Sequence, residues 1–388
     1  MIMQGKFLFK CAAVAMAVGL FVGGCGSSKK DSKVIKIGAL AESTGSNGSY
    51  GTAILNGMRL AVKEVNEKGV LGKKLELVAV DTKSSADAAA KGMARLVNDD
   101  KVDVASGIFA SASAIAASEV SEAAKVPYLA TGATNPAVTV GKDGKVKPYT
   151  FRACFIDPFQ GDIGARFATD TLLAKKAAIY VDSSSEYAKG LAEHFKESFS
   201  KRDGKIVAEY SYAQKETNFQ VALTKIKATQ PDVLYVPGYY EEVGRIIKQA
   251  RAMDINCAIV GGDGWDSPKL PEIASVKALN NTYFTNHFSP DAESAEVKSF
   301  VVNYLKEYKQ KPLACAVLGY DSVKLLADAI KRANSVDSQK VAEALAATKN
   351  FKAVTGSLAL DKNHDAIKSV AIIEYKDGRQ VYKTTIEP

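Results

Sequence analysis

Residues 34–80 decide the fold class, because two apolar runs in this stretch flank one long helical pattern. The run VIKIGAL at 34–40 predicts a strand, and LELVAV at 75–80 predicts the next one. Between them, residues 51–68 place apolar side chains on one face of a helix, which Gly69 closes. Strand, helix and strand at this spacing indicate a βαβ unit, and therefore a parallel sheet.

The same alternation extends along the rest of the chain. A first series runs to residue 130, and a second series of similar size begins after Phe151, so we predict two successive α/β lobes. Further helices are predicted at 86–97, 111–124, 187–199, 219–228, 241–252, 320–333 and 338–348, and further strands at 102–106, 126–130, 177–181, 205–210, 233–236, 258–261 and 369–375. In open α/β sheets, ligands bind where strands end and loops lead into helices. We therefore expect the ligand-binding residues in the loops that follow the strands.

The N-terminus has the pattern of a secretory signal. Lys6 and Lys10 form a basic region, and residues 11–22 are apolar or small. A retained membrane anchor is the alternative, but a span needs about 20 apolar residues, more than this stretch offers. We expect residues 1–24 to be a signal peptide and the protein to be extracytoplasmic.

The segment Val22-Gly23-Gly24-Cys25 resembles a bacterial lipobox, in which the cysteine is acylated and becomes the first mature residue. Small, polar and charged residues follow at 26–33, the composition of a flexible tether. A diacylglyceryl group on Cys25 would supply the two acyl chains that stable anchoring needs. We expect an anchor to the bacterial cell membrane at Cys25; an ordinary secreted protein with a free N-terminal cysteine is the alternative.

Composition excludes several classes. The chain has 51 Lys and Arg against 43 Asp and Glu, without a run of five like charges, so we expect no nucleic-acid partner. After the signal and Cys25, the remaining cysteines are Cys154, Cys257 and Cys315. None is spaced for a metal site or a disulfide framework, so we expect inert buried thiols, no metal and no cofactor.

Catalytic motifs are missing as well. The sequence has no G-x-S-x-G elbow, no Walker P-loop and no H-E-x-x-H. The three histidines, His194, His287 and His364, fall in separate predicted elements, and we interpret each as a surface residue. We therefore predict no catalytic residues, and an enzyme is the weaker hypothesis.

Two loops after strands carry groups that suit an anion. Ser111 begins a helix, where its hydroxyl and the backbone N–H groups can meet a carboxylate. An N-cap is the structural alternative for Ser111. The loop Thr131 to Pro136 offers Gly132, which permits close approach of the backbone, and the hydroxyl of Thr134. An ordinary turn before Pro136 is the alternative there.

A third loop suits a cation. Asp263 stands among glycines after the strand at 258–261, where a carboxylate can accept an ammonium group; a turn or helix cap is the alternative. Tyr50, Tyr187 and Tyr239 begin or precede helices after strands and can wall an apolar pocket, or belong to the core. Together these groups meet the needs of a free amino acid: donors for a carboxylate, an acceptor for an ammonium group and apolar walls.

At these residues the sequence resembles the branched-chain amino acid (Leu/Ile/Val) binding proteins, the type I periplasmic binding proteins of ABC importers. The resemblance covers nearly all of the chain after the signal. Its segments are Thr44-Gly45 through Tyr50-Gly51, Asn56-Gly57, Glu64-Val65-Asn66 with Gly69 and Gly72, Gly132 to Pro136, Gly238-Tyr239-Tyr240, Gln249-Ala250-Arg251, Gly262-Asp263-Gly264 and Gly319-Tyr320-Asp321.

The resemblance implies two Rossmann-like lobes with mainly parallel sheets, joined by three hinge crossings. Lobe I would be 34–154 plus 287–354, and lobe II 155–286 plus 355–388. It also implies the site residues. Ser111 and Thr134 would bind the ligand carboxylate; the carbonyl of Gly132, with Thr134 and Asp263, would bind the ammonium group; Tyr50, Phe109, Ala133, Tyr187 and Tyr239 would form the walls.

This sequence departs from the family pattern in two places. Asp263 stands where the Leu/Ile/Val binder has glutamate, which shortens the ammonium contact by one methylene. Ala110 stands where some members have a disulfide cysteine.

The expected function is that of a monomeric lipoprotein that binds a small amino acid, by default a branched-chain one, and delivers it to an ABC transporter permease. A sensory subunit that docks on a membrane receptor is the alternative, since fold does not settle function. An aromatic or small polar amino acid is the alternative ligand.

Overall fold

The computed structural model describes residues 33–387. The predicted signal peptide and Cys25 lie outside these residues. Within them, no helix is long and apolar enough to cross a membrane.

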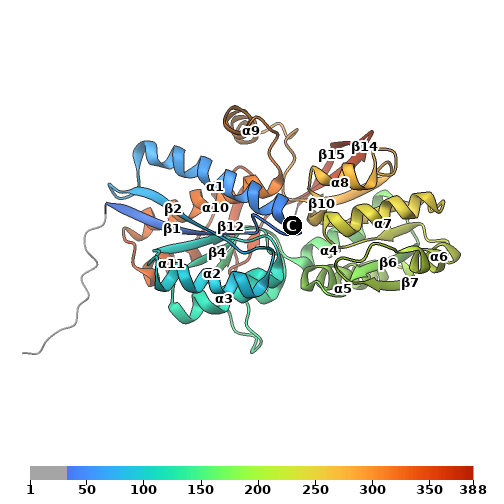
Figure 1. Ribbon diagram of the computed structural model, residues 1–388, viewed down its shortest axis with the longest axis horizontal. Helices are drawn as coiled ribbons and strands as arrows, with labels where there is room; N and C mark the ends of the chain where they lie inside the picture. Colours follow the sequence, from blue (N-terminus) through green and yellow to red (C-terminus); the bar gives the residue numbers. More distant parts are fainter. Residues whose placement is uncertain (1–32, 388) are drawn as a thin grey trace, which may run out of the picture. The chain divides into compact units, whose positions relative to one another are not determined.

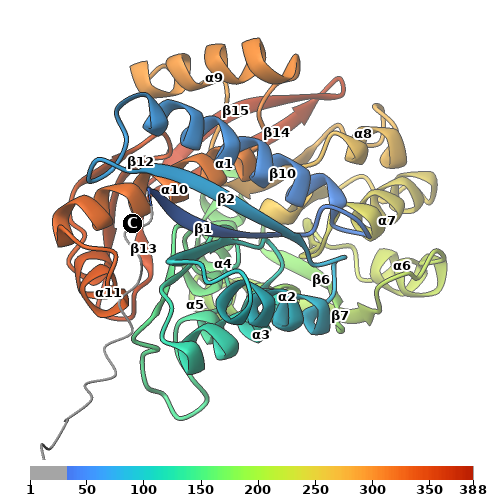
Figure 2. The same ribbon diagram turned by 60° about the vertical axis from the view of Figure 1, so that its left-hand side comes forward.

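The first sheet has five parallel strands in the order β2-β1-β3-β4-β5. Its strands are β1 (Val34–Ala41), β2 (Lys74–Asp81), β3 (Val104–Gly107), β4 (Tyr128–Ala130) and β5 (Thr150–Arg152), connected by α1 (Gly48–Lys68), α2 (Ala86–Asn98) and α3 (Ser111–Ala124). Helices α1 and α10 (Ala314–Ala333) cover one face of this sheet, and α2 and α3 cover the other (Figure 2).

The two faces of β1 show why the sheet is covered on both sides. Ile35, Ile37 and Ala39 pack into the cluster that contains α1, whereas Leu40 packs with Met93 of α2. Successive strand residues point to opposite faces, so an apolar run such as 34–40 needs a helix layer on each side.

The second sheet has seven strands in the order β15-β14-β10-β9-β8-β6-β7. The five strands from β6 to β10 are parallel, and β14 and β15 are added antiparallel at one edge. The strands are β6 (Lys176–Asp182), β7 (Lys205–Tyr212), β8 (Val233–Tyr235), β9 (Ala258–Gly261), β10 (Thr282–Asn286), β14 (Val370–Lys376) and β15 (Arg379–Ile386), and the helices are α4 (Asp157–Arg166), α5 (Glu186–Lys201), α6 (Gln220–Ala228), α7 (Tyr240–Ala252) and α8 (Lys269–Ala274).

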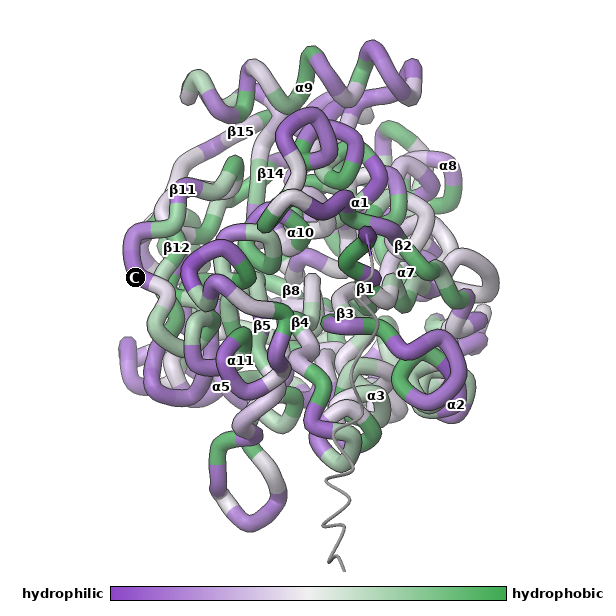
Figure 3. The backbone as a smooth tube through the Cα atoms, turned by 90° about the vertical axis from the view of Figure 1, so that its left-hand side faces the viewer, coloured by the Kyte–Doolittle hydropathy of each residue, from purple (hydrophilic) through white to green (hydrophobic). Residues whose placement is uncertain are grey.

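Figure 1 shows the two sheets and their helices as two lobes. The α/β fold with two lobes and mainly parallel sheets is confirmed. Three further elements complete it: α9 (Ala295–Tyr308), α11 (Ser338–Ala346) and a small antiparallel sheet of β11 (Phe351–Ala353), β12 (Gly356–Leu360) and β13 (Ala366–Ile367). Figure 3 shows hydrophobic and hydrophilic residues alternating along α9, which buries Val297, Phe300 and Tyr304 on one face.

The small sheet of β11, β12 and β13 spans the predicted lobe boundary between residues 354 and 355. The predicted boundary between 354 and 355 falls between β11 and β12, which pair directly with each other. Strand β14, which follows β13, belongs to the second sheet. We therefore propose that the last crossing between the lobes comes after β13, near Lys368; the other boundaries remain predictions.

Candidate functional site

The predicted ligand residues all follow the carboxyl ends of parallel strands. In the first lobe, Phe109 and Ser111 come after β3 and the loop 132–136 after β4. In the second lobe, Tyr239 comes after β8 and Asp263 after β9. Carboxyl ends of parallel strands lie along one edge of a sheet, so each lobe gathers its share of these residues on one side.

Four predicted aromatic residues form one buried cluster. Tyr50 stacks on Phe109 with ring centroids 4.2 Å apart, and Tyr187 stacks on Tyr239 at 5.2 Å. The two stacks meet where Tyr239 lies 6.0 Å from Tyr50 and 6.4 Å from Phe109. Because Tyr50 and Phe109 belong to the first lobe and the other two to the second, the cluster spans the junction between the lobes.

Hydrogen bonds join the lobes around this cluster. The hydroxyl of Tyr50 donates to the carbonyl of Gly264, and the Nδ2 of Asn135 donates to the carbonyl of Glu186 at 3.0 Å. The hydroxyl of Tyr240 donates to the carbonyl of Ser46 at 2.7 Å. The lobes are thus closed on one another at the predicted site.

Asp263 accepts hydrogen bonds from both lobe II helices that flank it. Its Oδ1 accepts from the Tyr187 hydroxyl and from Nε2 of Gln160, each at 2.8 Å. Its Oδ2 lies 3.1 Å from Nε2 of His287. The carboxylate is 1% exposed, so donors hold it in one orientation inside the protein.

The interpretation of His287 as a surface residue is wrong. Its side chain is buried, and its ring stacks on Phe155 with centroids 3.7 Å apart. Burial lowers the pKa of His287 below its ordinary value, against the opposing effect of Asp263. A neutral imidazole that donates from Nε2 fits the contact with the carboxylate.

Ser111 does not cap α3. The N-cap position is Ala110, and the Ser111 hydroxyl accepts a hydrogen bond from the backbone N–H of Asn135 at 3.3 Å. The alternative of an N-cap is therefore wrong. Ser111 instead joins the first turn of α3 to the loop that carries Thr134.

Thr134 and Gly132 lie in that loop. The Thr134 side chain is 1% exposed, and it interacts with the buried carboxyl of Asp157. A Cβ added at Gly132 would lie 2.4 Å from Cδ2 of Phe109. Glycine therefore lets the loop approach the aromatic cluster.

Two polar residues of α4 near Asp263 were missed at the sequence level. Gln160 binds Asp263 as described, and Asp157 donates its backbone N–H to the carbonyl of Thr134 at 2.9 Å. Burial raises the pKa of the Asp157 carboxyl to about 8, and the nearby Asp263 adds to this effect. Both residues follow β5, whose sequence Thr-Phe-Arg does not form an apolar run.

Two buried polar atoms beside Asp263 lack a protein partner in the described part of the chain. They are Oε1 of Gln160 and Nδ1 of His287. Buried polar groups are almost always hydrogen-bonded, to protein, water or ligand. The concentration of such atoms near Asp263 is what a site for a small polar ligand requires.

A groove of about 1150 Å³ opens elsewhere, beside the start of α1. Its lining includes Ser43, Ser267, Lys311 and Arg379, but none of the residues predicted to bind the ligand. Convergent polar groups identify a ligand site better than volume does, so we place the candidate site around Asp263.

No group of three or more His, Cys, Asp or Glu side chains within 33–387 is arranged to hold a metal ion. Cys154, Cys257 and Cys315 are free thiols, the first and last of them buried and Cys257 partly exposed.

Comparisons with known proteins give the family and the fold of the chain. A sequence profile described as "Periplasmic binding protein" matches residues 34–380. Leu/Ile/Val-binding protein homolog 1 of Brucella melitensis is 30% identical over 383 residues, which cover 97% of this chain and 99% of the relative.

Two solved structures are similar throughout. The leucine binding protein LivK from Thermotoga maritima superposes with a TM-score of 0.86 at 35% identity, covering 91% of this chain and 99% of that one. The branched-chain amino acid transporter substrate binding protein LivJ from Streptococcus pneumoniae, in complex with isoleucine, has a TM-score of 0.85 at 38% identity, covering 92% and 100%.

Proposed function

The chain belongs to the periplasmic binding protein family, and from this premise we propose that it binds a branched-chain L-amino acid outside the membrane and delivers it, as a monomer, to an ABC importer. Members of the family and the structural neighbours are substrate-binding proteins, not enzymes. The similar proteins named above are described as binding leucine, isoleucine or valine.

One observation supports the amino-acid ligand above all others. The buried carboxyl of Asp157 interacts with the side chain of Thr134 from the first lobe and with the charge of Asp263 from the second, so Thr134 and Asp263 lie near the same buried region. We propose that Asp263, Thr134 and the carbonyl of Gly132 bind the ammonium group, and that Ser111 and Thr134 bind the carboxylate. Charge-assisted hydrogen bonds of this kind favour a zwitterion over a neutral solute.

The aromatic lining of the proposed site favours a ligand with an apolar side chain. Tyr50, Phe109, Tyr187 and Tyr239 present rings at the lobe junction, all at most 6% exposed, and Ala133 lies in the adjoining loop. Aromatic rings bury the methyl groups of an aliphatic ligand, and each CH₂ removed from water contributes about 0.8 kcal/mol. We therefore expect L-leucine, L-isoleucine and L-valine to bind more tightly than L-alanine.

Calorimetry tests the proposal directly. The protein is unfolded, dialysed to remove retained ligand, refolded and titrated with each of the twenty amino acids and with the D-isomers of leucine, isoleucine, valine and alanine. The expected result is binding of the three branched-chain amino acids, weaker binding of L-alanine and none of their D-isomers. Failure of all twenty to bind would overturn the proposed ligand class, and tightest binding of an aromatic or polar amino acid would overturn the side-chain assignment.

We also propose that the protein is a lipoprotein, with residues 1–24 removed and Cys25 acylated. The motif at 22–25 and the tether-like composition of 26–33 support this. Cys25→Ser is expected to release the protein from the membrane fraction into the soluble fraction when cells are fractionated. Intact mass spectrometry of the wild-type protein should show an acylated N-terminus at Cys25; an unmodified Cys25 in membrane-bound protein would contradict the anchor.

A further inference from the structure

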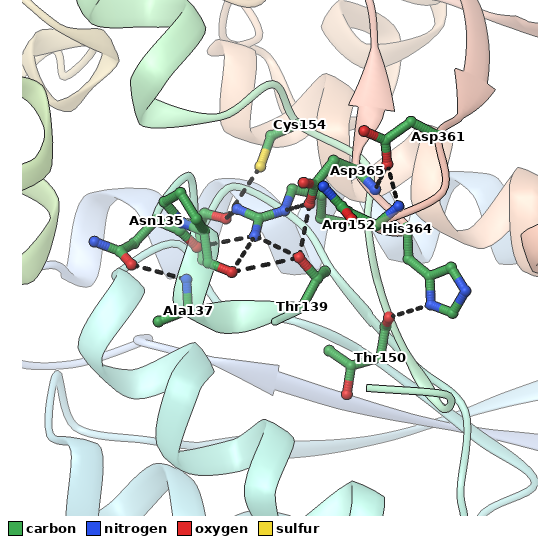
Figure 4. Close-up of polar contacts among 12 residues, drawn as sticks. Asn135, Ala137, Thr139, Thr150, Arg152, Cys154, Asp361, His364 and Asp365 are labelled. Carbon is green, nitrogen blue, oxygen red and sulfur yellow. Dashed lines mark hydrogen bonds and ion pairs between the residues drawn. The ribbon is translucent and has the colours of Figure 1, made fainter. Parts of the chain in front are cut away.

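Arg152, at the end of β5, is fully buried directly beneath the loop that carries Thr134. Its Nη1 donates to the carbonyl of Ala133 at 2.8 Å, and its Nη2 to the carbonyl of Asn135 at 2.9 Å. Nη2 also donates to the hydroxyl of Thr139 at 2.9 Å. Figure 4 shows the guanidinium between this loop and Asp365, whose Oδ1 lies 2.6 Å from Nε.

These contacts fix the orientation of Thr134, which lies between the two carbonyls. Carbonyl groups alternate in direction along an extended segment. Since those of Ala133 and Asn135 point to Arg152, the carbonyl of Thr134 points the other way, where it accepts from the N–H of Asp157. Arg152 therefore sets the direction in which the loop presents Thr134, without itself reaching the aromatic cluster.

Asp365 comes from a distant part of the chain. It lies at the start of the short segment that leads through β13 to β14 of the second lobe. Its backbone N–H donates to Oδ1 of Asp361 at 2.9 Å, and its Oδ1 accepts from the Thr139 hydroxyl at 2.8 Å. The neighbouring His364 stacks on Phe151 of β5 with centroids 4.2 Å apart. The ion pair thus joins the Thr134 loop to the chain segment next to a lobe crossing.

We propose that the Arg152–Asp365 pair is a positioning device that holds the loop 132–136 in its binding-competent conformation before the ligand arrives. The inference rests on the role proposed for Thr134. A guanidinium presents its donors in a rigid fork, so it can fix two carbonyls at once in a way that a lysine ammonium cannot. Asp365 holds that fork in place and supplies the countercharge that a buried arginine needs.

The pair has a kinetic consequence. If it keeps the loop preorganised, its loss lowers the fraction of protein that can bind, and the apparent Kd rises by the inverse of that fraction. The complex itself is unchanged once formed. The association rate should therefore fall while the dissociation rate stays close to that of the wild-type protein.

The test uses Asp365→Asn, which keeps the size of the side chain and removes its charge, and Arg152→Lys, which keeps the charge and removes the fork. L-leucine is the probe, and the fluorescence of Trp265, the single tryptophan, follows binding by stopped flow because this residue lies two positions from Asp263. Both variants should bind about tenfold more weakly, the scale of a typical coupling between sites, mainly through slower association. Glu197→Gln, which breaks the exposed Lys201–Glu197 pair on α5, is the control and should bind like the wild-type protein.

Hydrogen exchange distinguishes a loss of order in the loop 132–136 from a general loss of protein stability. In the ligand-free variants, amides of 132–140 should exchange faster than in the control, and saturating L-leucine should restore their protection. A variant that melts at a lower temperature but keeps the wild-type Kd, association rate and loop exchange would overturn the proposal.

If Asp365→Asn and Arg152→Lys do not fold, Thr139→Val removes only the hydroxyl shared by the pair; it should slow association by a smaller factor, and an unchanged rate would overturn the proposal. If the wild-type protein binds no amino acid, the proposed function fails, but faster loop exchange in the ligand-free variants would still support the positioning role and its absence would refute it.

Discussion

Binding of L-leucine by Asp263→Asn is expected to be weaker than binding by the wild-type protein by roughly 10- to 150-fold, because a hydrogen bond to a charged group contributes about 1.5–3 kcal/mol. The carboxylate of Asp263 is buried, so water does not screen its attraction for an ammonium group. Asparagine keeps the shape and one acceptor oxygen, removes the charge and replaces the second oxygen with an NH₂ donor. Isothermal titration of ligand-free protein measures the change in Kd.

Asp263→Ala should be at least as damaging, for an additional reason. Tyr187, Gln160 and His287 all make their contacts with this carboxylate, and alanine leaves their polar atoms unpaired in a buried place. The thermal unfolding midpoint should therefore fall for Asp263→Ala more than for Asp263→Asn.

The control for both variants is Asp254→Asn, at an exposed side chain that pairs only with Lys227 at 3.8 Å. It should bind L-leucine like the wild-type protein. An Asp263→Asn variant whose Kd matches that of this control would exclude Asp263 as the ammonium acceptor, even if other residues still bind the ligand.

The sequence predicted the fold well where periodicity was long and regular. The predicted helix 111–124 coincides with α3 (Ser111–Ala124), and the predicted strand 34–40 lacks only the last residue of β1 (Val34–Ala41). These segments bury a whole face against neighbouring elements, so the spacing of their apolar residues carries the information. Strand β5 (Thr150–Arg152) has one apolar residue between two polar ones, so it shows no apolar run, and it was not predicted.

Part of the candidate site was predictable, because its residues lie directly after predicted strands. Tyr50, Tyr187 and Tyr239 were singled out from their places after strands, and Phe109 from the family resemblance. The structure gathers all four into one cluster. The partners of Asp263 were missed. Gln160 follows the undetected β5, and His287 looked like a surface residue because a lone histidine carries no local sign of burial; only the packing of Phe155 and Asp263 around it decides that.

Some segments that carried the family resemblance serve the architecture and not the site. Gly57 of α1 and Gly319 of α10 face each other where these helices cross: a Cβ at Gly57 would lie 1.8 Å from the carbonyl oxygen of Ala316, and one at Gly319 would lie 2.4 Å from that of Ile54. The helix backbones are therefore in direct contact. Asp321, in the same segment as Gly319, accepts from the backbone N–H of Val354 at 2.8 Å and does not approach Asp263 by any contact within the described chain.

Gly57→Ala is therefore expected to destabilise the protein strongly while leaving its ligand chemistry intact. Alanine favours the helical state by about 1 kcal/mol over glycine, which alone would stabilise α1. At this crossing the added methyl group must push the two helices apart, and overpacking a core costs about 1–3 kcal/mol or more. Because the obstacle is backbone, which cannot rotate away, we expect the upper end of that range and a net loss of about 2 kcal/mol.

Urea unfolding of the ligand-free protein measures this loss, and Arg59→Ala, at an exposed position of the same helix, is the control; a surface change of this kind should shift the stability by about 0.5 kcal/mol or less. At a temperature where Gly57→Ala is folded, its Kd for L-leucine should stay within about threefold of the control, since the crossing contributes no atom to the proposed ligand contacts and the ratio reflects less than 1 kcal/mol. Equal stability of the two variants would mean that the helices can separate freely. If Gly57→Ala were stable but did not bind L-leucine, the crossing of α1 and α10 would be needed for ligand binding. It would then be wrong to divide the residues shared with the family into those that hold the helices together and those that bind the ligand.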